Sequence, residues 1–545
     1  PSGRRPARRA ACRRGRDGVS RRVVTAIAAA ATAALAVSCA QVPTDDHGGM
    51  LRLPLINDPI LNPVIAPDIG SIMINKVIFP GLVRPDEQLR PTPDLALSWT
   101  TSDSGLTYTF ALRPNVKWHD GAPFTARDVK FTFDQILDGS SGSQQRSDFA
   151  AVAGVDVVDS LTVRFRLRAP FAPFLSLLGY NAGILPEHAF RGRTLTDAVD
   201  FNRARPIGTG PFQVGEAKPG SAIILERNPD YYGSAPKLAS IVFKIVPDVN
   251  VQVAQLRAGE LDVILVEPAN LTSLERDPAI SVHEAPVVQH YYVGFNQRHA
   301  LFAPAPVRRA LGYAVNRSAI IKGVLKGHGD VPVATIPIAL KDYFADSLPR
   351  LRFDRDSALA LFALAGWRPG SDGRLHNAKG ETFRFTLFVD KGNPSREQAA
   401  LAVQADLQAI GIDVTLRTLE FATIVRDHLL QGNFDATLIW WTTPPDPDQW
   451  AFYSTGQDHN HVAYSNARAD SLLTEGRATS DPVRRRALYD AFQAVAIEDP
   501  PVLVLYYPRE LVAMRSTVHG LPRLGLRDAL RHSEQLSVGR AEKRP

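Results

Sequence analysis

Few side chains in this sequence are arranged as the reactive groups of an enzyme are. The sequence contains neither a G-x-S-x-G motif nor an H-E-x-x-H motif. Its two cysteines, Cys12 and Cys39, both lie near the start, so the rest of the chain can form no disulfide and no thiol nucleophile. His459 and His461 could share one face of an extended segment and bind a metal, but no third ligand is evident. We therefore expect no enzyme activity, no cofactor and no resident metal.

Aromatic side chains are concentrated in the stretch WWTTPPDPDQW, which holds three of the six tryptophans of the chain. An apolar run, FDATLIWW, leads into it and three prolines follow, as at the end of a buried strand. Successive residues of a strand point to opposite faces, so Trp440 and Trp441 are expected on different sides of a sheet. We predict that Trp441 is presented to a pocket and that Trp450 serves packing.

The elements around these residues alternate between strand and helix patterns. FRFTLFVD (383–390) and VTLRTLEF (414–421) have the apolar and β-branched patterning of strands. Residues 396–410 read as a helix that ends at Gly411. Residues 383–440 are therefore predicted to run strand, helix, strand, helix, strand, which is typical of an α/β fold.

The net positive charge of the chain comes from its first 22 residues. Residues 1–22 hold nine arginines and one acid, so the remaining 53 basic and 55 acidic residues carry a net charge of −2. A nearly neutral body argues against nucleic acid as a partner. Sixteen uncharged residues (23–38) follow the arginines and lead to Cys39, so that the junction reads Ala36-Val37-Ser38-Cys39, the pattern of an export signal. We expect lipidation at Cys39 by way of a lipobox, with simple cleavage or an uncleaved anchor as alternatives, and leave Sec and twin-arginine export both open.

The length of 545 residues predicts two or three domains. Residues 1–39 are expected to be a lipoprotein signal peptide and residues 40–49, which are small and polar, a tether. Residues 536–545 are expected to be a disordered tail.

Several phrases of the sequence occur in a recognisable order. They are LALSWTTSDSGLTYTFALRPNVKWHDGAPFTARDVKFTF (95–133), GTGPF (208–212), ERNPDYYG (226–233), LRAGELDV (256–263), GFNQ (294–297) with PVRRALGYAVNR (306–317), LFALAGW, LQAIGIDV and ARADSLL (467–473). Over residues 50–530 the chain resembles the extracytoplasmic solute-binding proteins of the peptide/nickel class, family 5, which serve ABC importers.

This resemblance implies a periplasmic-binding-protein-like α/β fold of two lobes (a Venus flytrap), with ligand captured between them. Lobe I would hold residues 50–89, 206–290 and 499–535, with an extra domain at 90–205, and lobe II residues 291–498. The chain would cross between lobes near residues 290 and 498. The partners implied are a solute or peptide, an ABC permease and, through the lipid anchor, the outer face of the cytoplasmic membrane. A monomer is expected.

The resemblance also shows which ligand contacts are missing. In dipeptide-binding relatives, a Trp-Thr-Gly-Asp segment provides the carboxylate that holds the ligand's amino group. Here Trp441-Thr442-Thr443 is followed by prolines, and Asp446 matches only a later Asp-Pro. Asp390 stands where those relatives have the arginine that holds the ligand's carboxylate, with Lys391 beside it as a substitute. The pocket aromatic between Glu420 and Ala422 is kept as Phe421.

Without either charged contact, a dipeptide would bind weakly. We therefore expect an oligopeptide ligand, with an oligosaccharide, a glycoside or a metal chelate as alternatives. A scaffold or sensor lipoprotein of the same fold is the remaining alternative. The residues predicted to contact ligand are Trp440, Trp441, Thr442, Thr443, Phe421, Asp390, Lys391 and Asp446.

Overall fold

The computed structural model describes residues 49–442 and 444–539. The predicted signal peptide, the lipobox cysteine and almost all of the tether lie outside these residues. The first described element, β1 (Gly49–Leu55), begins at the last residue of the predicted tether. It pairs in parallel with β10 (Leu238–Ile245), and antiparallel β9 (Ala222–Arg227) and β8 (Phe212–Lys218) complete a four-stranded sheet.

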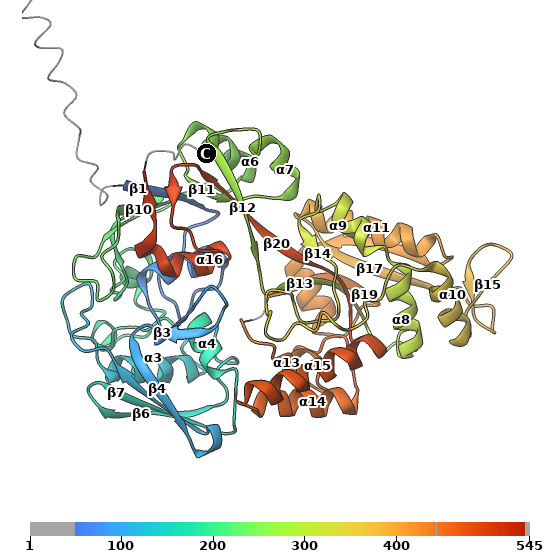
Figure 1. Cartoon of the computed structure of the whole chain (residues 1–545), viewed down its shortest axis with the longest axis horizontal. Coiled ribbons are helices and arrows are strands. Elements are labelled where there is room, and N and C mark those ends of the chain that lie inside the picture. Colours follow the sequence, from blue (N-terminus) through green and yellow to red (C-terminus); the bar gives the residue numbers. More distant parts are fainter. Residues whose placement is uncertain (1–48, 443, 540–545) are drawn as a thin grey trace, which may run out of the picture. The chain divides into compact units, whose positions relative to one another are not determined.

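A second four-stranded sheet lies within residues 90–205, in the order β4 (Ala96–Ser102), β5 (Thr107–Leu112), β7 (Thr162–Leu167) and β6 (Val152–Asp159). Helix α3 (Ala126–Leu137) packs against it (Figure 1). A capping box between Thr125 and Asp128 starts α3, and Phe133 contacts Phe165 of β7 edge-on at 4.8 Å. One continuous apolar core joins this sheet to the first. The predicted extra domain therefore has a sheet of its own but shares its core with the rest of lobe I.

The GTGPF segment passes so close to the end of helix α2 (Ile69–Ile78) that only glycine fits there. A Cβ added to Gly208 would lie 2.0 Å from the carbonyl oxygen of Ile78. The buried side of this junction is held by His119, whose Nδ1 accepts the Gly208 N–H (3.1 Å) while its Nε2 donates to the carbonyl oxygen of Gly210 (3.1 Å). Burial lowers the pKa of His119 to about 4.

This histidine makes stability depend on pH. In the unfolded chain His119 takes up a proton below pH 6.5, whereas the folded protein resists this until about pH 4. The contribution is thus complete above pH 6.5 and is lost as the pH falls towards 4. We expect His119→Gln, which can keep both hydrogen bonds but cannot titrate, to remove about one proton from the slope of unfolding free energy against pH in this window. Urea unfolding of both proteins at several pH values measures the slopes, and equal slopes would contradict the assignment.

The largest sheet has eight strands and includes both connections between the lobes. Its main order is β11 (Val263–Leu265), β20 (Leu503–Arg515), β13 (Gln289–Phe295), β19 (Ala436–Thr442), β17 (Arg384–Asp390) and β18 (Asp413–Leu419). The two other strands, β12 (Ile280–Pro286) and β14 (Gly329–Asp330), also pair with β20.

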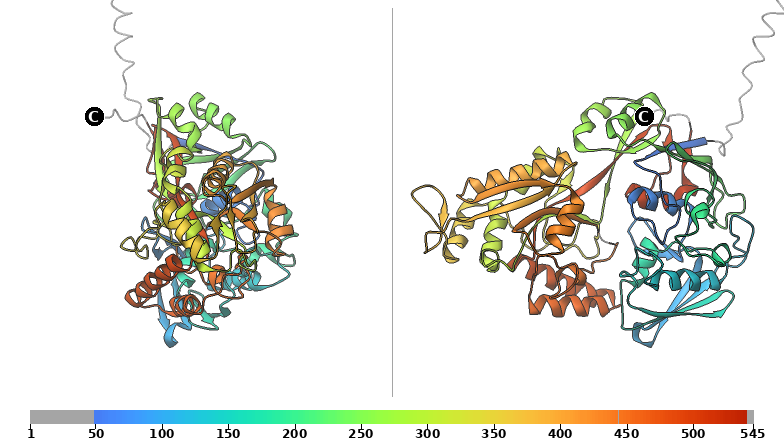
Figure 2. Two further views of the ribbon diagram at one scale, coloured as in Figure 1. Left: turned by 90° about the vertical axis from the view of Figure 1, so that its right-hand side faces the viewer. Right: turned by 180° about the vertical axis from the view of Figure 1, so that it is seen from behind.

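Strand β20 belongs to both lobes. Residues 503–508 pair with β13 and β14, whereas residues 509–515 pair with β11 and β12. Figures 1 and 2 show β12 and β20 as the strands that link the lobes. The predicted crossing near residue 290 is close to the turn at 287–288, between β12 and β13. The other crossing lies near residue 508 rather than 498, because β20 continues through the hinge as one strand.

Lobe II contains the α/β unit predicted from the sequence. Strand β17 pairs in parallel with both β18 and β19, and α11 (Pro394–Gln408) connects β17 to β18. Asn393 caps α11, and Pro394 occupies its first turn. Helices α8 (Ala305–Ala314) and α10 (Arg355–Leu364) contribute to the same core.

The remaining elements are shorter or lie around these sheets. They are β2 (Val83–Pro85), β3 (Pro91–Pro93), η1 (Asp103–Gly105), α4 (Phe174–Asn181), η2 (Glu187–Phe190), α5 (Val199–Arg203), α6 (Val249–Ala258), α7 (Pro268–Leu274), α9 (Arg317–Gly323), β15 (Arg368–Pro369), β16 (Leu375–His376), α12 (Phe421–Thr423), η3 (Ile424–Leu429), α13 (Trp450–Tyr453), α14 (Ala467–Ala478), α15 (Pro482–Glu498), β21 (Val518–His519), α16 (Leu526–Ala529), η4 (Leu530–Gln535) and β22 (Ser537–Val538). None of the helices in the described ranges combines the length and apolar character needed to cross a bilayer.

The prediction of a disordered tail from residue 536 is wrong for residues 536–539. Leu536 is fully buried, and β22 pairs with β21. The polar composition of the segment concealed this, because a single leucine inserted into the lobe I core holds its start in place. Residues 540–545 lie outside the described part of the chain.

Candidate functional site: a cavity at the hinge

A cavity of about 270 Å³ lies where β20 passes from one lobe to the other. From the lobe I side it is lined by Tyr180, Glu267 and Arg527, among others. From the lobe II side it is lined by Tyr291, Ser395 and Thr442, among others. A molecule bound here would contact both lobes and the hinge strands at once. This is the position in which a ligand can stabilise a closed arrangement of two lobes.

An aromatic row crosses three neighbouring strands beside the cavity. Tyr291 of β13 is in register with Tyr506 of β20 and with Trp440 of β19. The Tyr291 and Tyr506 rings stack at 4.8 Å, and the Tyr291 and Trp440 rings stack at 6.4 Å. Phe421, with 41% of its surface exposed, extends the row 4.8 Å beyond Trp440. Tyr291 and Tyr506 line the cavity, whereas Trp440 and Phe421 continue the row outside the lining.

Trp441 lies on the other face of the sheet. Its ring packs against Phe452 at 4.3 Å and against His459 at 5.5 Å, beside a separate cavity of only about 20 Å³. The two tryptophans do face opposite ways, as strand alternation requires. However, the face with the hinge cavity is the face of Trp440, so the structure argues against Trp441 as the tryptophan presented to ligand.

The histidine pair lies next to Trp441. The His459 and His461 rings are 6.2 Å apart, and burial lowers the pKa of His461. Within residues 49–442 and 444–539, no group of three or more His, Cys, Asp or Glu side chains could hold a metal ion. Two imidazoles alone do not make a protein metal site.

Asp390 is held by a neighbouring arginine. It is 3% exposed and accepts a hydrogen bond from Arg396 Nε at 2.7 Å, with a second bond from Arg396 Nη2. Burial opposes the charge of Arg396, but the bonds to Asp390 outweigh it and raise the pKa of the guanidinium. The guanidinium also lies 4.0 Å from the Trp440 ring. The Asp390–Arg396 pair therefore packs against the aromatic row at Trp440.

Lys391 is more exposed than its neighbour and pairs with Glu420 at 2.6 Å. Neither Asp390 nor Lys391 lines the hinge cavity. The structure therefore shows neither of them in the position of a clamp for a ligand's carboxylate.

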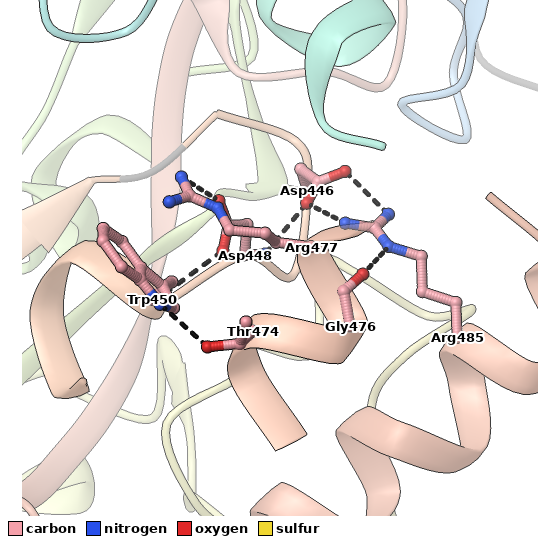
Figure 3. A network of polar contacts seen from close by, with 7 residues as sticks. All are labelled: Asp446, Asp448, Trp450, Thr474, Gly476, Arg477 and Arg485. Atoms are coloured by element: carbon pink, nitrogen blue, oxygen red, sulfur yellow. Dashed lines mark hydrogen bonds and ion pairs between the residues drawn. The ribbon is translucent and has the colours of Figure 1, made fainter. Parts of the chain in front are cut away.

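Asp446 anchors the loop that follows β19. It is 5% exposed and accepts hydrogen bonds from Arg485 Nη1 at 2.9 Å and Nη2 at 2.6 Å (Figure 3). In the same network Asp448 pairs with Arg477 at 3.0 Å, and the Arg477 guanidinium lies 4.4 Å from the Trp450 ring. Trp450 thus serves packing, as predicted, and Asp446 fastens the loop to α15 instead of facing the cavity.

Thr442 is the predicted residue that lines the hinge cavity directly. Its hydroxyl accepts a hydrogen bond from the side-chain amide of Gln289 at 2.9 Å. Thr443 lies outside the described residues. Sequence reasoning missed Tyr291 and Glu267. Tyr291 lies in the strand-like phrase HYYVGFN, and Glu267 between a strand and a proline-started helix, where α/β proteins often place binding residues.

Comparison with known proteins agrees with this architecture. The chain belongs to the bacterial extracellular solute-binding proteins, family 5, whose middle region matches residues 90–461. It is 31% identical over 482 residues to the oligopeptide-binding protein AppA of Bacillus subtilis, covering 87% of this chain and 89% of AppA. The resemblance seen in the sequence and the two-lobe α/β fold that it implied are thereby confirmed.

Solved structures give the same result. The structure of AppA from Bacillus subtilis in complex with a nonapeptide superposes with a TM-score of 0.76 at 30% identity, covering 91% of this chain and 99% of AppA. NikZ from Campylobacter jejuni, in complex with Ni(L-His), superposes with a TM-score of 0.76 at 26% identity, covering 91% of this chain and all of that one. Relatives of this fold thus hold ligands as different as a nonapeptide and a nickel chelate.

Proposed function

We propose that this protein is the substrate-binding component of an ABC importer and that it captures an oligopeptide in the hinge cavity. The observation that carries the proposal is the cavity itself, which residues of both lobes line at the point where β20 crosses between them. The similarity to AppA over most of both chains supports a peptide as the ligand.

A peptide longer than a dipeptide is favoured by the charges at the site. Asp390 is already bound by Arg396 and Asp446 by Arg485, so neither carboxylate is offered to a ligand's amino group. Lys391 is paired with Glu420 on the surface. A ligand that depends less on both of its termini, and more on its backbone and side chains, suits the aromatic row better.

Delivery would follow from closure of the lobes. A ligand that contacts both lobes binds the closed arrangement more tightly, and this difference in affinity shifts the population towards it. The permease would then recognise the closed form. In this proposal the protein is an exported monomer, anchored by a lipid at Cys39 on the outer face of the cytoplasmic membrane.

Native mass spectrometry of the protein from residue 40 onward, purified without unfolding, tests the proposal. A series of bound peptide masses would support an oligopeptide receptor. A sugar, glycoside or metal-chelate mass would replace the peptide by one of those ligands; the Ni(L-His) complex of NikZ makes the chelate a specific alternative. An empty cavity, together with no binding of added peptides, would overturn the transport proposal in favour of a scaffold or sensor.

Phe421→Ala is expected to weaken peptide binding by about five- to thirtyfold, because aromatic anchors at binding surfaces contribute about 1–2 kcal/mol or more. Stability should change little, since the side chain is 41% exposed. Phe353→Ala is the matched control, because that ring is 37% exposed, whereas the ring contact with Trp440 belongs to Phe421. Isothermal titration with a peptide identified in the purified protein measures both affinities. Equal affinities for the two variants would exclude Phe421 from the site.

A further inference from the structure

Two carboxylates in the lining of the hinge cavity, Glu267 and Glu510, form no ion pair with a cation within the described residues. Glu267 lies in the lining, directly before α7. Within residues 49–442 and 444–539, no Lys, Arg or His side chain forms an ion pair with it. Its one side-chain hydrogen bond comes from Ser395 Oγ of α11, which donates to Glu267 Oε2 at 3.2 Å. This contact joins a residue of the lobe I side to one of lobe II.

The other charged groups in the lining have partners. Arg509 pairs with Asp330 at 2.9 Å and with Glu284 at 2.8 Å, and Glu284 also binds His328. Arg527 pairs with Asp528 at 3.2 Å.

The remaining carboxylate of the lining, Glu510, accepts the backbone N–H of Leu526, and burial raises its pKa. Burial thus disfavours the charged form of Glu510, which leaves Glu267 as the carboxylate of the lining that is suited to pair with a cation of the ligand.

Aromatic rings stand beside this carboxylate. Tyr291 and Tyr506, whose rings stack at 4.8 Å, line the same cavity as Glu267. Burial raises the pKa of both hydroxyls, and the Glu267 carboxylate raises it further while Arg396 opposes the rise. A carboxylate next to tyrosine rings is a favourable site for an ammonium or guanidinium group, since both the charge and the ring faces attract a cation.

We propose that Glu267 binds a cationic group of the ligand, so that the hinge cavity selects peptides carrying an ammonium or guanidinium at this point. The assignment rests on the proposed function. It gives the ligand's cation a partner that comes from the strand-to-helix turn before α7 rather than from the loop after β19. It also explains how the cavity can bind a cationic group although the loop after β19 offers no free carboxylate.

The test uses three nonapeptides of one alanine- and serine-based sequence. The first has a free amino terminus and no basic side chain, the second is acetylated at its amino terminus, and the third is acetylated but carries one lysine. We expect Glu267→Gln to weaken binding of the first or the third peptide by at least about 30-fold, as for the loss of one partner of a buried charge pair. Binding of the second should change by less than about threefold. The peptide that loses affinity shows whether the cation is the α-amino group or a side chain.

Two further variants are controls for the effect of Glu267→Gln. Glu275→Gln removes the same charge at the exposed end of α7 and should leave every affinity within about twofold. Glu267→Asp keeps the charge and should retain more affinity than Glu267→Gln. Thermal unfolding of each variant shows that the fold is intact.

The outcomes separate the two claims. If the unaltered protein binds the peptides and Glu267→Gln binds all three equally well, the assignment of Glu267 is overturned while the peptide receptor stands. If the unaltered protein binds none of them, the proposed function fails and the assignment fails with it.

Discussion

Asp446→Ala is expected to lower the free energy of unfolding by about 3–5 kcal/mol, because it leaves the Arg485 guanidinium buried without its counter-ion. Both side chains are about 5% exposed, and two hydrogen bonds join them. Burial disfavours the charge of Arg485, but pairing with Asp446 favours that charge more strongly, so the pKa of the guanidinium is raised. Urea denaturation of the unliganded protein measures the loss.

A matched control lies one residue away on the same helix. Arg484 pairs with Glu475, but their side chains are 66% and 40% exposed. Glu475→Gln should therefore cost no more than about 1 kcal/mol. Replacing both partners of the buried pair, Asp446→Leu with Arg485→Leu, should destabilise less than Asp446→Ala alone, since no charge remains buried. If Asp446→Ala weakened ligand binding but not folding, Asp446 would be a ligand residue after all.

Asp390→Ala is expected to cost a similar amount, about 3–5 kcal/mol, for the same physical reason. Asp390 and Arg396 have side-chain exposures of 4% and 11%, and Arg396 is enclosed further by Trp440 and Tyr291. Ligand affinity should also fall, because Asp390 holds Arg396 in place against the Trp440 and Tyr291 rings of the aromatic row. Chemical denaturation and titration calorimetry on the same samples measure the two effects.

Lys391→Ala provides the control for Asp390. It removes a charge next in sequence, but its partner Glu420 is 63% exposed, so the change in stability should stay below about 1 kcal/mol. If Asp390→Ala left stability unchanged and Lys391→Ala abolished binding, the original interpretation of this segment as a ligand clamp would be restored.

The sequence predicted the secondary structure of lobe II well, because its signals are local. The alternation in 383–390, the helical run that ends at Gly411 and the next strand each follow from the spacing of apolar residues and from a glycine stop. The structure has β17, α11 and β18 at these places. The order of the family phrases was enough to predict the two-lobe fold.

The site was less predictable, because its residues come together only through long-range contacts. Alternation required Trp440 and Trp441 to face opposite ways, but the strands on either side of β19 decide which face meets the hinge cavity. The sequence does not show whether a carboxylate is free or paired with a cation. Asp446 is paired by a residue 39 positions away, and Glu267 meets Ser395 across 128 positions.

By itself, the sequence determined the class of protein, the α/β pattern and the absence of cysteine chemistry beyond residue 39, since these follow from residue types and local spacing. Only the tertiary structure decided which charges are paired and which of them line the cavity. Folding buries Asp390 and Asp446 beside arginines and leaves Glu267 open at the hinge. Burying a charge is costly unless a partner is brought to it, and that partner is chosen by the packing of distant segments.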